Sequence, residues 1–202
     1  MQKPRVYLIG GAPGSGKTTL GCALAAKIGG SSVTIDDLMT VAKTATTPES
    51  HPDFYLYRSP VSHLEYFTDS SFERFREDAE RQQRAIWPCV KRLIEKHFAW
   101  TTTPLVIDGW HLRPAEVAML DQEIVRTCWI NIAPQVLEQR ERKNTDFLQG
   151  SSDPEKMFQN FLARSLWYND FLKSEAETYG LPVIFQDGCV SVEEMCHKIL
   201  TR

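Results

Sequence analysis

The chain has 202 residues, of which 42% are hydrophobic and 24% are charged, and its formal net charge is −3. This length and composition are typical of one globular domain, which we expect to span residues 1–202. The weak negative charge gives no general attraction to nucleic acid or to an anionic membrane, and no apolar run approaches the ~20 residues that span a bilayer. The five cysteines include no C-x-x-C pair, and no signal peptide precedes the first apolar run. We therefore expect a cytoplasmic protein with reduced thiols.

The first informative stretch is GAPGSGKT at residues 11–18, which fits the pattern G-x-x-x-x-G-K-[ST] of a phosphate-binding P-loop. An apolar run at 6–9 predicts a strand before it, and residues 19–28 after it have helical spacing. The glycines allow successive N–H groups to face phosphate oxygens, and the start of the helix adds donors. We expect the nucleotide to be bound by Gly11, Ala12, Pro13, Gly14, Ser15, Gly16, Lys17, Thr18 and Thr19.

Two side chains of this loop have predicted chemical roles. Lys17 is expected to reach the β- and γ-phosphates and to act in catalysis, and the Thr18 hydroxyl is expected to ligate Mg²⁺. The alternative is a Gly-rich turn that only links a strand to a helix.

The second predicted strand covers residues 32–35 and ends at Asp36 and Asp37. A carboxylate at the carboxyl end of a strand, near a P-loop, is placed to take a proton from an acceptor hydroxyl or to bind Mg²⁺ through water. Asp36 lies nearer the strand and is our predicted base, with Asp37 as the alternative. A third possibility is that one of them only caps the next helix.

The connection from residue 36 to residue 104 is unusually long for a simple crossover. A polar stretch at 44–60 precedes a helical pattern at about 70–97, which Pro88 should kink. We expect a helical insertion over about 40–100 that covers the acceptor side of the site. Its aromatic residues either line an acceptor pocket or pack the core of the insertion: Phe54, Tyr55, Tyr57, Tyr66 and Phe67.

The third predicted strand, at 105–107, ends at Asp108. An apolar strand that ends in Asp is the Walker-B arrangement, so we expect Asp108 to position the metal together with Thr18. The alternative is a turn Asp before a glycine. A few residues later, Arg113 is predicted to clamp a phosphate or carboxylate of the acceptor. His111 is expected to be structural or to contact the acceptor.

The fourth predicted strand, at 128–132, leads into a helix that begins at Pro134 and ends in basic residues. Arg140 and Arg142 are predicted to stabilise charge on the transferring phosphoryl group, as part of a lid over about 140–153. The alternative is the ordinary preference of basic residues for helix C-termini. Arg164, on the following helix, is a further candidate.

The last third of the chain contains clear signals for helix ends. Asp153-Pro154-Glu155 predicts the start of a long helix that ends near Gly180, and residues 191–194 fit a capping box. A fifth strand is predicted at 182–185, and the following residues, 186–189, are placed to meet the nucleotide base. The alternation of strands and helices predicts a three-layer α/β/α sandwich with a five-stranded parallel sheet.

Taken together, these motifs resemble the P-loop kinases of small molecules and nucleotides. Over nearly the whole chain the pattern is most similar to the kinase domain of the 2-phosphoglycerate kinase family. The similarity rests on GAPGSGKT, on TIDDLM at 34–39, on the helix at 70–97 and on DGWHLRP at 108–114. The last of these also resembles the D-G-[FY]-P-R turn of adenylate kinases. The resemblance implies a P-loop NTPase fold with strand order 2-3-1-4-5 and ATP as the phosphoryl donor.

We therefore expect an ATP- and Mg²⁺-dependent kinase that transfers the γ-phosphoryl group to a hydroxyl of a small-molecule acceptor. A toxin-like kinase of a nucleotide sugar and an antibiotic-modifying kinase share the same motifs. A nucleotide-dependent switch ATPase is the alternative from another class, although the sequence contains no N-K-x-D element for guanine. The expected partner is the acceptor, without nucleic acid or membrane, and the expected state is a monomer or homodimer.

Overall fold

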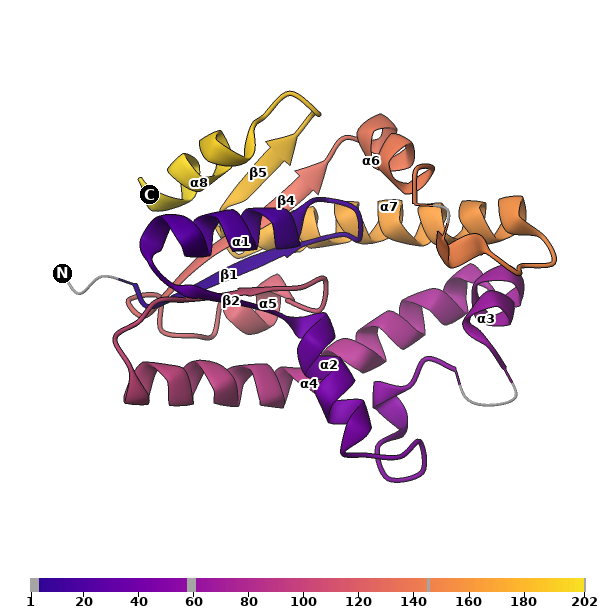
Figure 1. Ribbon diagram of the computed structural model, residues 1–202, viewed down its shortest axis with the longest axis horizontal. Helices are drawn as coiled ribbons and strands as arrows, with labels where there is room; N and C mark the ends of the chain where they lie inside the picture. The colour runs from indigo at the N-terminus through magenta and orange to yellow at the C-terminus, as the bar shows by residue number, and fades with distance from the viewer. Residues whose placement is uncertain (1–3, 58–60, 145, 202) are drawn as a thin grey trace.

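A five-stranded parallel sheet lies at the centre of the computed structural model, which describes residues 4–57, 61–144 and 146–201 (Figure 1). Its strand order is β2-β3-β1-β4-β5, which confirms the predicted order. All five predicted strands are present, with bounds that differ slightly from the expected ones: β1 (Val6–Gly11), β2 (Ser31–Thr34), β3 (Leu105–Asp108), β4 (Val125–Ile132) and β5 (Val183–Gln186).

The central strand β1 is buried along its whole length. Its side chains alternate between two cores, because Val6 and Leu8 belong to one cluster and Tyr7 and Ile9 to the other. A strand that is apolar on both faces requires a covering layer on each side. This explains why the run is continuously apolar rather than alternating.

Helices cover both faces of the sheet, as a three-layer sandwich requires. On one face α1 (Lys17–Ile28) and α8 (Val192–Leu200) bury Leu20, Leu24 and Met195 against the strands. On the other face lie α4 (Phe72–Trp100), α5 (Pro114–Val117) and α7 (Pro154–Thr178). The predicted fold class is confirmed. None of the helices in the described ranges has the length and apolarity of a membrane span.

The region between β2 and β3 is helical, but it differs in detail from the prediction. It contains α2 (Ile35–Thr44), the short turn η1 (Pro52–Phe54), α3 (His63–Asp69) and α4. The pattern at 70–97 therefore belongs to α4 alone, and α3 was not expected as a separate helix. The helix α4 continues through Pro88, and Figure 1 shows that it changes direction along its length.

The predicted insertion and lid both extend over residues outside the described ranges, 58–60 in the insertion and 145 in the lid. The lid region contains the end of α6 (Pro134–Glu141) and the turn η2 (Asp146–Leu148). These boundaries stay predictions. The expected helix starts are confirmed. Asp153 caps α7 by accepting from the Lys156 N–H, and Ser191 and Glu194 form a capping box.

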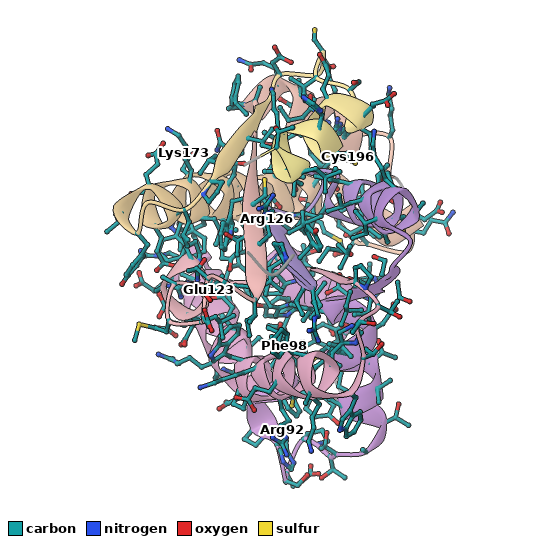
Figure 2. All side chains as sticks on the ribbon, turned by 90° about the vertical axis from the view of Figure 1, so that its left-hand side faces the viewer. Arg92, Phe98, Glu123, Arg126, Lys173 and Cys196 are labelled. Atoms are coloured by element: carbon teal, nitrogen blue, oxygen red, sulfur yellow. The ribbon has the colours of Figure 1, made fainter. Side chains whose placement is uncertain are left out.

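The amino edge of the sheet contacts the end of a helix, whereas the carboxyl edge holds the P-loop. Figure 2 views the amino ends, where Arg126 lies centrally, between Cys196 of α8 and Phe98 of α4. The guanidinium of Arg126 donates to the Ile199 and Leu200 carbonyls at the end of α8, both at 3.1 Å. This edge is thus used to close the end of a helix. The P-loop connects β1 to α1 at the opposite, carboxyl edge, where open α/β sheets bind ligands.

Candidate active site

The P-loop adopts backbone conformations that favour glycine at three positions, Gly11, Gly14 and Gly16. Gly14 and Gly16 have φ values of +74° and +94°, in the left-handed region. A Cβ atom added to Gly14 would lie 2.2 Å from Glu141 Oε1 and 2.7 Å from Leu137 Cδ1. Gly16 precedes α1 and provides no side-chain cap. The first amides of α1 therefore remain available for an anion.

Lys17 is buried and points into this loop. Its ammonium group donates to the Ala12 carbonyl at 2.8 Å. Burial lowers the pKa of Lys17 to about 8, although the nearby carboxylates of Asp108, Asp36 and Glu141 favour its charged form. The ammonium group therefore lies within the loop, and its contact with a bound phosphate stays a prediction.

Thr18 and Asp108 are brought together, although they lie 90 residues apart in the sequence. The Thr18 hydroxyl donates to Asp108 Oδ1 at 2.8 Å. Asp108 Oδ2 is buried and has no hydrogen-bond partner among the described residues, and burial raises the pKa of this carboxyl. An unpartnered carboxylate oxygen beside a hydroxyl suits a hard cation with oxygen ligands. The residues present therefore fit the expected Mg²⁺.

No group of three or more His, Cys, Asp or Glu side chains that could hold a metal occurs in the part of the chain that the structure describes. Mg²⁺ is commonly bound by few protein ligands together with oxygens of phosphates and water.

The predicted end of the second strand is wrong by one residue. Ile35 begins α2, and the Thr34 hydroxyl accepts from the Asp36 N–H at 3.3 Å as its N-cap. Asp36 and Asp37 therefore do not close the strand and do not cap the helix. They lie in its first turn, where negative charge is favourable. The buried side chain of Ile35 packs against Gly109, which anchors this start to the end of β3.

Asp36 still faces the P-loop from α2. Its charge favours the protonated form of Lys17, and its Oδ1 lies 3.9 Å from His111 Nδ1. The Asp36 side chain is 66% exposed, so a substrate can reach it. The exposed, nearby carboxylate agrees with the predicted role as a base, which stays a prediction.

His111 is a buried and neutral residue beside Asp36. Neither ring nitrogen has a hydrogen-bond partner among the described residues, and the ring lies 3.8 Å from that of Trp110. Burial, followed by the charges of Arg164, Lys17 and Lys43, lowers the pKa of His111 to about 3. The imidazole thus keeps one free donor and one free acceptor near the base.

Arg113 is paired within the fold, and its predicted role as an acceptor anchor stays a prediction. Its Nε donates to Glu175 Oε2 at 3.0 Å, its Nη2 lies 2.5 Å from Glu175 Oε1, and its Nη1 donates to Gln83 Oε1 at 3.0 Å. This bidentate contact, which is partly buried, joins the start of α5 to α7. The guanidinium is therefore already paired within the fold.

Arg140 and Arg142 also make contacts within the fold, and their predicted role at the transferring phosphoryl group stays a prediction. Arg140 Nη1 donates to the Gly14 and Ser15 carbonyls, both at 3.2 Å, which places it against the outside of the P-loop. Arg142 is exposed and pairs with Glu138 at 3.0 Å and Glu155 at 3.4 Å. Arg142 therefore connects α6 to α7. Neither guanidinium is recorded in contact with the Asp36 side of the loop.

Arg140 instead borders a cavity of about 450 Å³ between the P-loop and the start of α8. Val190, Val192 and Met195 give this cavity apolar walls. The buried Gln186 side chain donates to the Val190 carbonyl at 2.9 Å and accepts from the Gly188 N–H at 2.8 Å, which orders the loop after β5. This is where residues 186–189 were expected to meet the nucleotide base.

Arg164, the further candidate from the sequence, is buried close to Trp110. Its side chain on α7 is buried, and its guanidinium carbon lies 4.8 Å from the centre of the Trp110 ring. Arg164 Nε has no hydrogen-bond partner among the described residues, and burial lowers the pKa of this group. Its positive charge contributes to the lowered pKa of His111, and the charge of Asp36 acts in turn on Arg164, so this cation lies in the region of Asp36.

Two residues at the site were not predicted. Lys43 lies seven residues after Asp36, on the same face of α2, and its ammonium lies 5.8 Å from the centre of the Tyr55 ring. The spacing of seven was a signal that could have indicated it. Glu141 is buried at the end of α6 and approaches Gly14. No local pattern distinguishes Glu141 from other helical acids.

The comparisons with known proteins agree with this geometry. Residues 1–57 match the family model described as Zeta toxin. The 2-phosphoglycerate kinase of Methanocaldococcus jannaschii is 23% identical over the whole chain, and the chain spans 64% of that relative's length.

Solved structures share the fold over nearly the whole chain. Shikimate kinase from Bacteroides thetaiotaomicron is 15% identical, with 97% of this chain and 96% of that chain covered and a TM-score of 0.51. The protein TT1252 from Thermus thermophilus is 18% identical, with 99% and 98% covered and a TM-score of 0.54. The predicted similarity to P-loop kinases of small molecules is thereby confirmed.

Proposed function

We propose that this chain is an ATP-dependent kinase that transfers the γ-phosphoryl group to a hydroxyl of a small-molecule acceptor. One observation carries the proposal: Lys17, the Thr18–Asp108 pair and Asp36 gather around the P-loop at the carboxyl edge of the sheet. Relatives named 2-phosphoglycerate kinase and shikimate kinase support this class of reaction.

The nucleotide side of the proposed site consists of the P-loop and the cavity beside it. The loop amides and Lys17 hold the phosphates, and the base enters the cavity next to Arg140. Thr18 and Asp108 would hold Mg²⁺, which when bound supplies charge neutralisation at the phosphate oxygens.

On the acceptor side, Asp36 accepts the proton of the acceptor hydroxyl as its oxygen attacks the γ-phosphorus. A new O–P bond forms, the bond from that phosphorus to the bridging oxygen breaks, and ADP leaves. The neutral His111 offers a hydrogen bond to the acceptor hydroxyl or to Asp36. Arg164 takes the charge-stabilising role that the sequence assigned to Arg140 and Arg142.

The test is release of ADP from MgATP in the presence and absence of hydroxylated compounds. The panel contains 2-phosphoglycerate, shikimate, nucleotide sugars and aminoglycosides, and we expect at least one to stimulate release. ADP release that no acceptor changes, but that a protein partner alters, would support the switch ATPase instead.

A toxin-like kinase of a nucleotide sugar is the second candidate. The match to the Zeta toxin family favours it, because residues 1–57 contain both the P-loop and Asp36. Stimulation by a nucleotide sugar alone would select this candidate. The expected cytoplasmic location and the expected monomer or homodimer stay predictions.

A further inference from the structure

A second hollow, of about 420 Å³, lies in the region between β2 and β3. It is formed by residues 55–57 after η1, by Val61, and by residues at α3 and the first turns of α4. Three of its lining residues are tyrosines and two are arginines: Tyr55, Leu56, Tyr57, Val61, Tyr66, Ser70, Arg74 and Arg81. The roles proposed above for the kinase use none of these side chains.

Some aromatic side chains of this region pack in the core, and others line the hollow. Phe54 is 7% exposed and belongs to the main core cluster, and the Phe67 ring stacks 5.7 Å from Phe75. Tyr57, in contrast, is 39% exposed, and its ring lies 5.6 Å from that of Tyr66. Tyr57, with the buried Tyr66 ring (4% exposed) packed behind it, thus offers an aromatic wall to a ligand that enters the hollow.

A buried carboxylate fixes the polar side of this hollow. Asp78, which is 2% exposed, accepts from the Tyr66 hydroxyl at 3.0 Å, from Arg74 Nε at 2.6 Å and from Arg81 Nη2 at 2.5 Å. A carboxylate at this depth is stable only when its oxygens are well paired. Asp78 therefore holds one phenol and two guanidinium groups in fixed orientations.

Arg74 and Arg81 each have N–H groups that make no hydrogen bond among the described residues. Arg74 uses only its Nε in the recorded contacts, so neither terminal nitrogen has a hydrogen-bond partner among the described residues. Arg81 uses Nη1 in a longer, 3.3 Å contact with the partly exposed Asp53. Arg164 adds a third guanidinium nearby, 5.9 Å from the centre of the Phe67 ring. The Phe67 ring lies 5.0 Å from that of Tyr66, and the Arg164 guanidinium also lies 4.8 Å from the centre of the Trp110 ring, so these contacts connect the hollow to the cationic side of the active site.

We propose that this hollow is the distal part of the acceptor site and that it binds a ring bearing an anionic group. The ring packs against Tyr57 and Tyr66, and the phosphate or carboxylate accepts from Arg74 and Arg81. The inference rests on the proposed kinase function, since it places the rest of the acceptor relative to Asp36. The acceptor class that follows is an anionic, ring-containing compound with a free hydroxyl.

The test is calorimetric titration of the full chain with phenyl phosphate, benzoate and phenol as probes. We expect saturable binding of an anionic probe and no detectable binding of phenol up to about 10 mM. Phenyl phosphate and benzoate distinguish a phosphate from a carboxylate as the preferred anion. Equal affinity for phenol and for both anions overturns the proposal, as does the absence of binding by all three probes.

Variants assign the binding to these residues. Arg74→Gln is expected to weaken the preferred anionic probe about tenfold. Arg92→Gln is the matched control, because Arg92 also pairs within α4, with Glu95 at 3.3 Å, but is not among the residues that line the hollow. If Arg74→Gln binds like the wild type, the proposal fails.

A second variant keeps the test decisive if the first one unfolds. Tyr57→Leu changes a partly exposed side chain, and it should weaken phenyl phosphate while leaving inorganic phosphate unchanged. If Tyr57→Leu weakens the binding of phenyl phosphate and of inorganic phosphate equally, the proposed aromatic contact is wrong. ATP is titrated into each variant in parallel, and we expect unchanged affinity. If the wild-type chain does not bind ATP, the kinase proposal fails, whatever the titrations show for the hollow.

Discussion

Buried polar atoms without a partner gather at the carboxyl edge of the sheet. Asp108 Oδ2, both nitrogens of His111 and Arg164 Nε have no hydrogen-bond partner among the described residues. Each such group costs about 1–3 kcal/mol when it is left unsatisfied. Gln83, Ser165 and Tyr168 also have such atoms, but those of Asp108, His111 and Arg164 lie near the P-loop edge, where a bound ligand would satisfy them.

Replacing Asp36 by asparagine tests proton transfer separately from ATP binding. Asn keeps the size of the side chain but cannot accept a proton, so Asp36→Asn should lower kcat by about 10² to 10⁴ and leave the KM for ATP nearly unchanged. The measurement is steady-state ADP release with the stimulating acceptor. Asp37→Asn, the neighbouring change in the same helical turn, should keep most of the activity. The reverse pattern would reassign the base to Asp37.

His111 predicts a pH dependence of folding stability. Its pKa in the folded chain is about 3, whereas the ordinary value is 6.5. Below pH 6.5 the unfolded chain gains a proton that the folded chain does not, so stability is complete at higher pH and is lost as the pH falls towards 3. The charges that face His111 are Asp36 and Lys43 on α2, Lys17 on the P-loop side and Arg164 on α7.

The expected loss from His111 between pH 7 and pH 5.5 is about 1 kcal/mol. Urea unfolding of the wild type and of His111→Gln at these two pH values measures it, because the variant should lack this part of the loss. His63→Gln, at an exposed histidine, should behave as the wild type. Identical pH dependence of the wild type and His111→Gln would contradict the prediction.

At the scale of elements, the predicted parts of the site are those carried by short local patterns. The P-loop and Asp108 each follow an apolar strand directly, so parallel pairing alone brings them to one edge. The start of α2 was harder to predict, because Ile35 is apolar and its burial is equally consistent with a strand end and with the first residue of a helix. Thr34 decides the boundary by capping.

The directions of the arginines were not predictable in the same way. Arg113 pairs with Glu175, 62 residues away, and Arg142 pairs with Glu155 across the lid region. Such partners are set by the packing of α5 and α6 on α7, which no local pattern encodes. Arg164 was a candidate from the sequence. The feature that distinguishes it is a buried Nε with no hydrogen-bond partner among the described residues, and this is a property of the tertiary structure.

The contact between α6 and the P-loop gives a prediction at this scale. Gly14→Ala and Gly29→Ala both place a Cβ on a residue with positive φ, which costs about 1–2 kcal/mol. At Gly14 the new atom also meets Glu141 and Leu137 of α6, whereas nothing lies within 4 Å at Gly29. We expect Gly14→Ala to lose more stability in thermal unfolding and also to lose ATP affinity in titration. Equal effects of the two changes would refute this role of α6.

At the scale of the whole molecule, α7 connects the proposed chemistry to the core. Its first half packs beside α3 and carries Arg164. Tyr168 and Leu172 follow in the large core cluster, and Glu175 then holds Arg113. A ligand that contacts Arg164 therefore acts on a helix that is anchored along its length. Binding at the carboxyl edge should for this reason stabilise the entire fold.

MgATP is accordingly expected to raise the melting temperature of the chain. At 100 times its Kd, a ligand that binds only the folded state adds about 2.7 kcal/mol, which corresponds to about 5 to 10 °C for a domain of this size. Lys17→Ala should abolish this shift, and with it ADP release, while the chain remains folded. Lys27→Ala on the same helix is the control, because Lys27 is exposed and pairs with Glu193, and it should keep the shift. A full shift in Lys17→Ala would mean that the nucleotide binds elsewhere than in the P-loop.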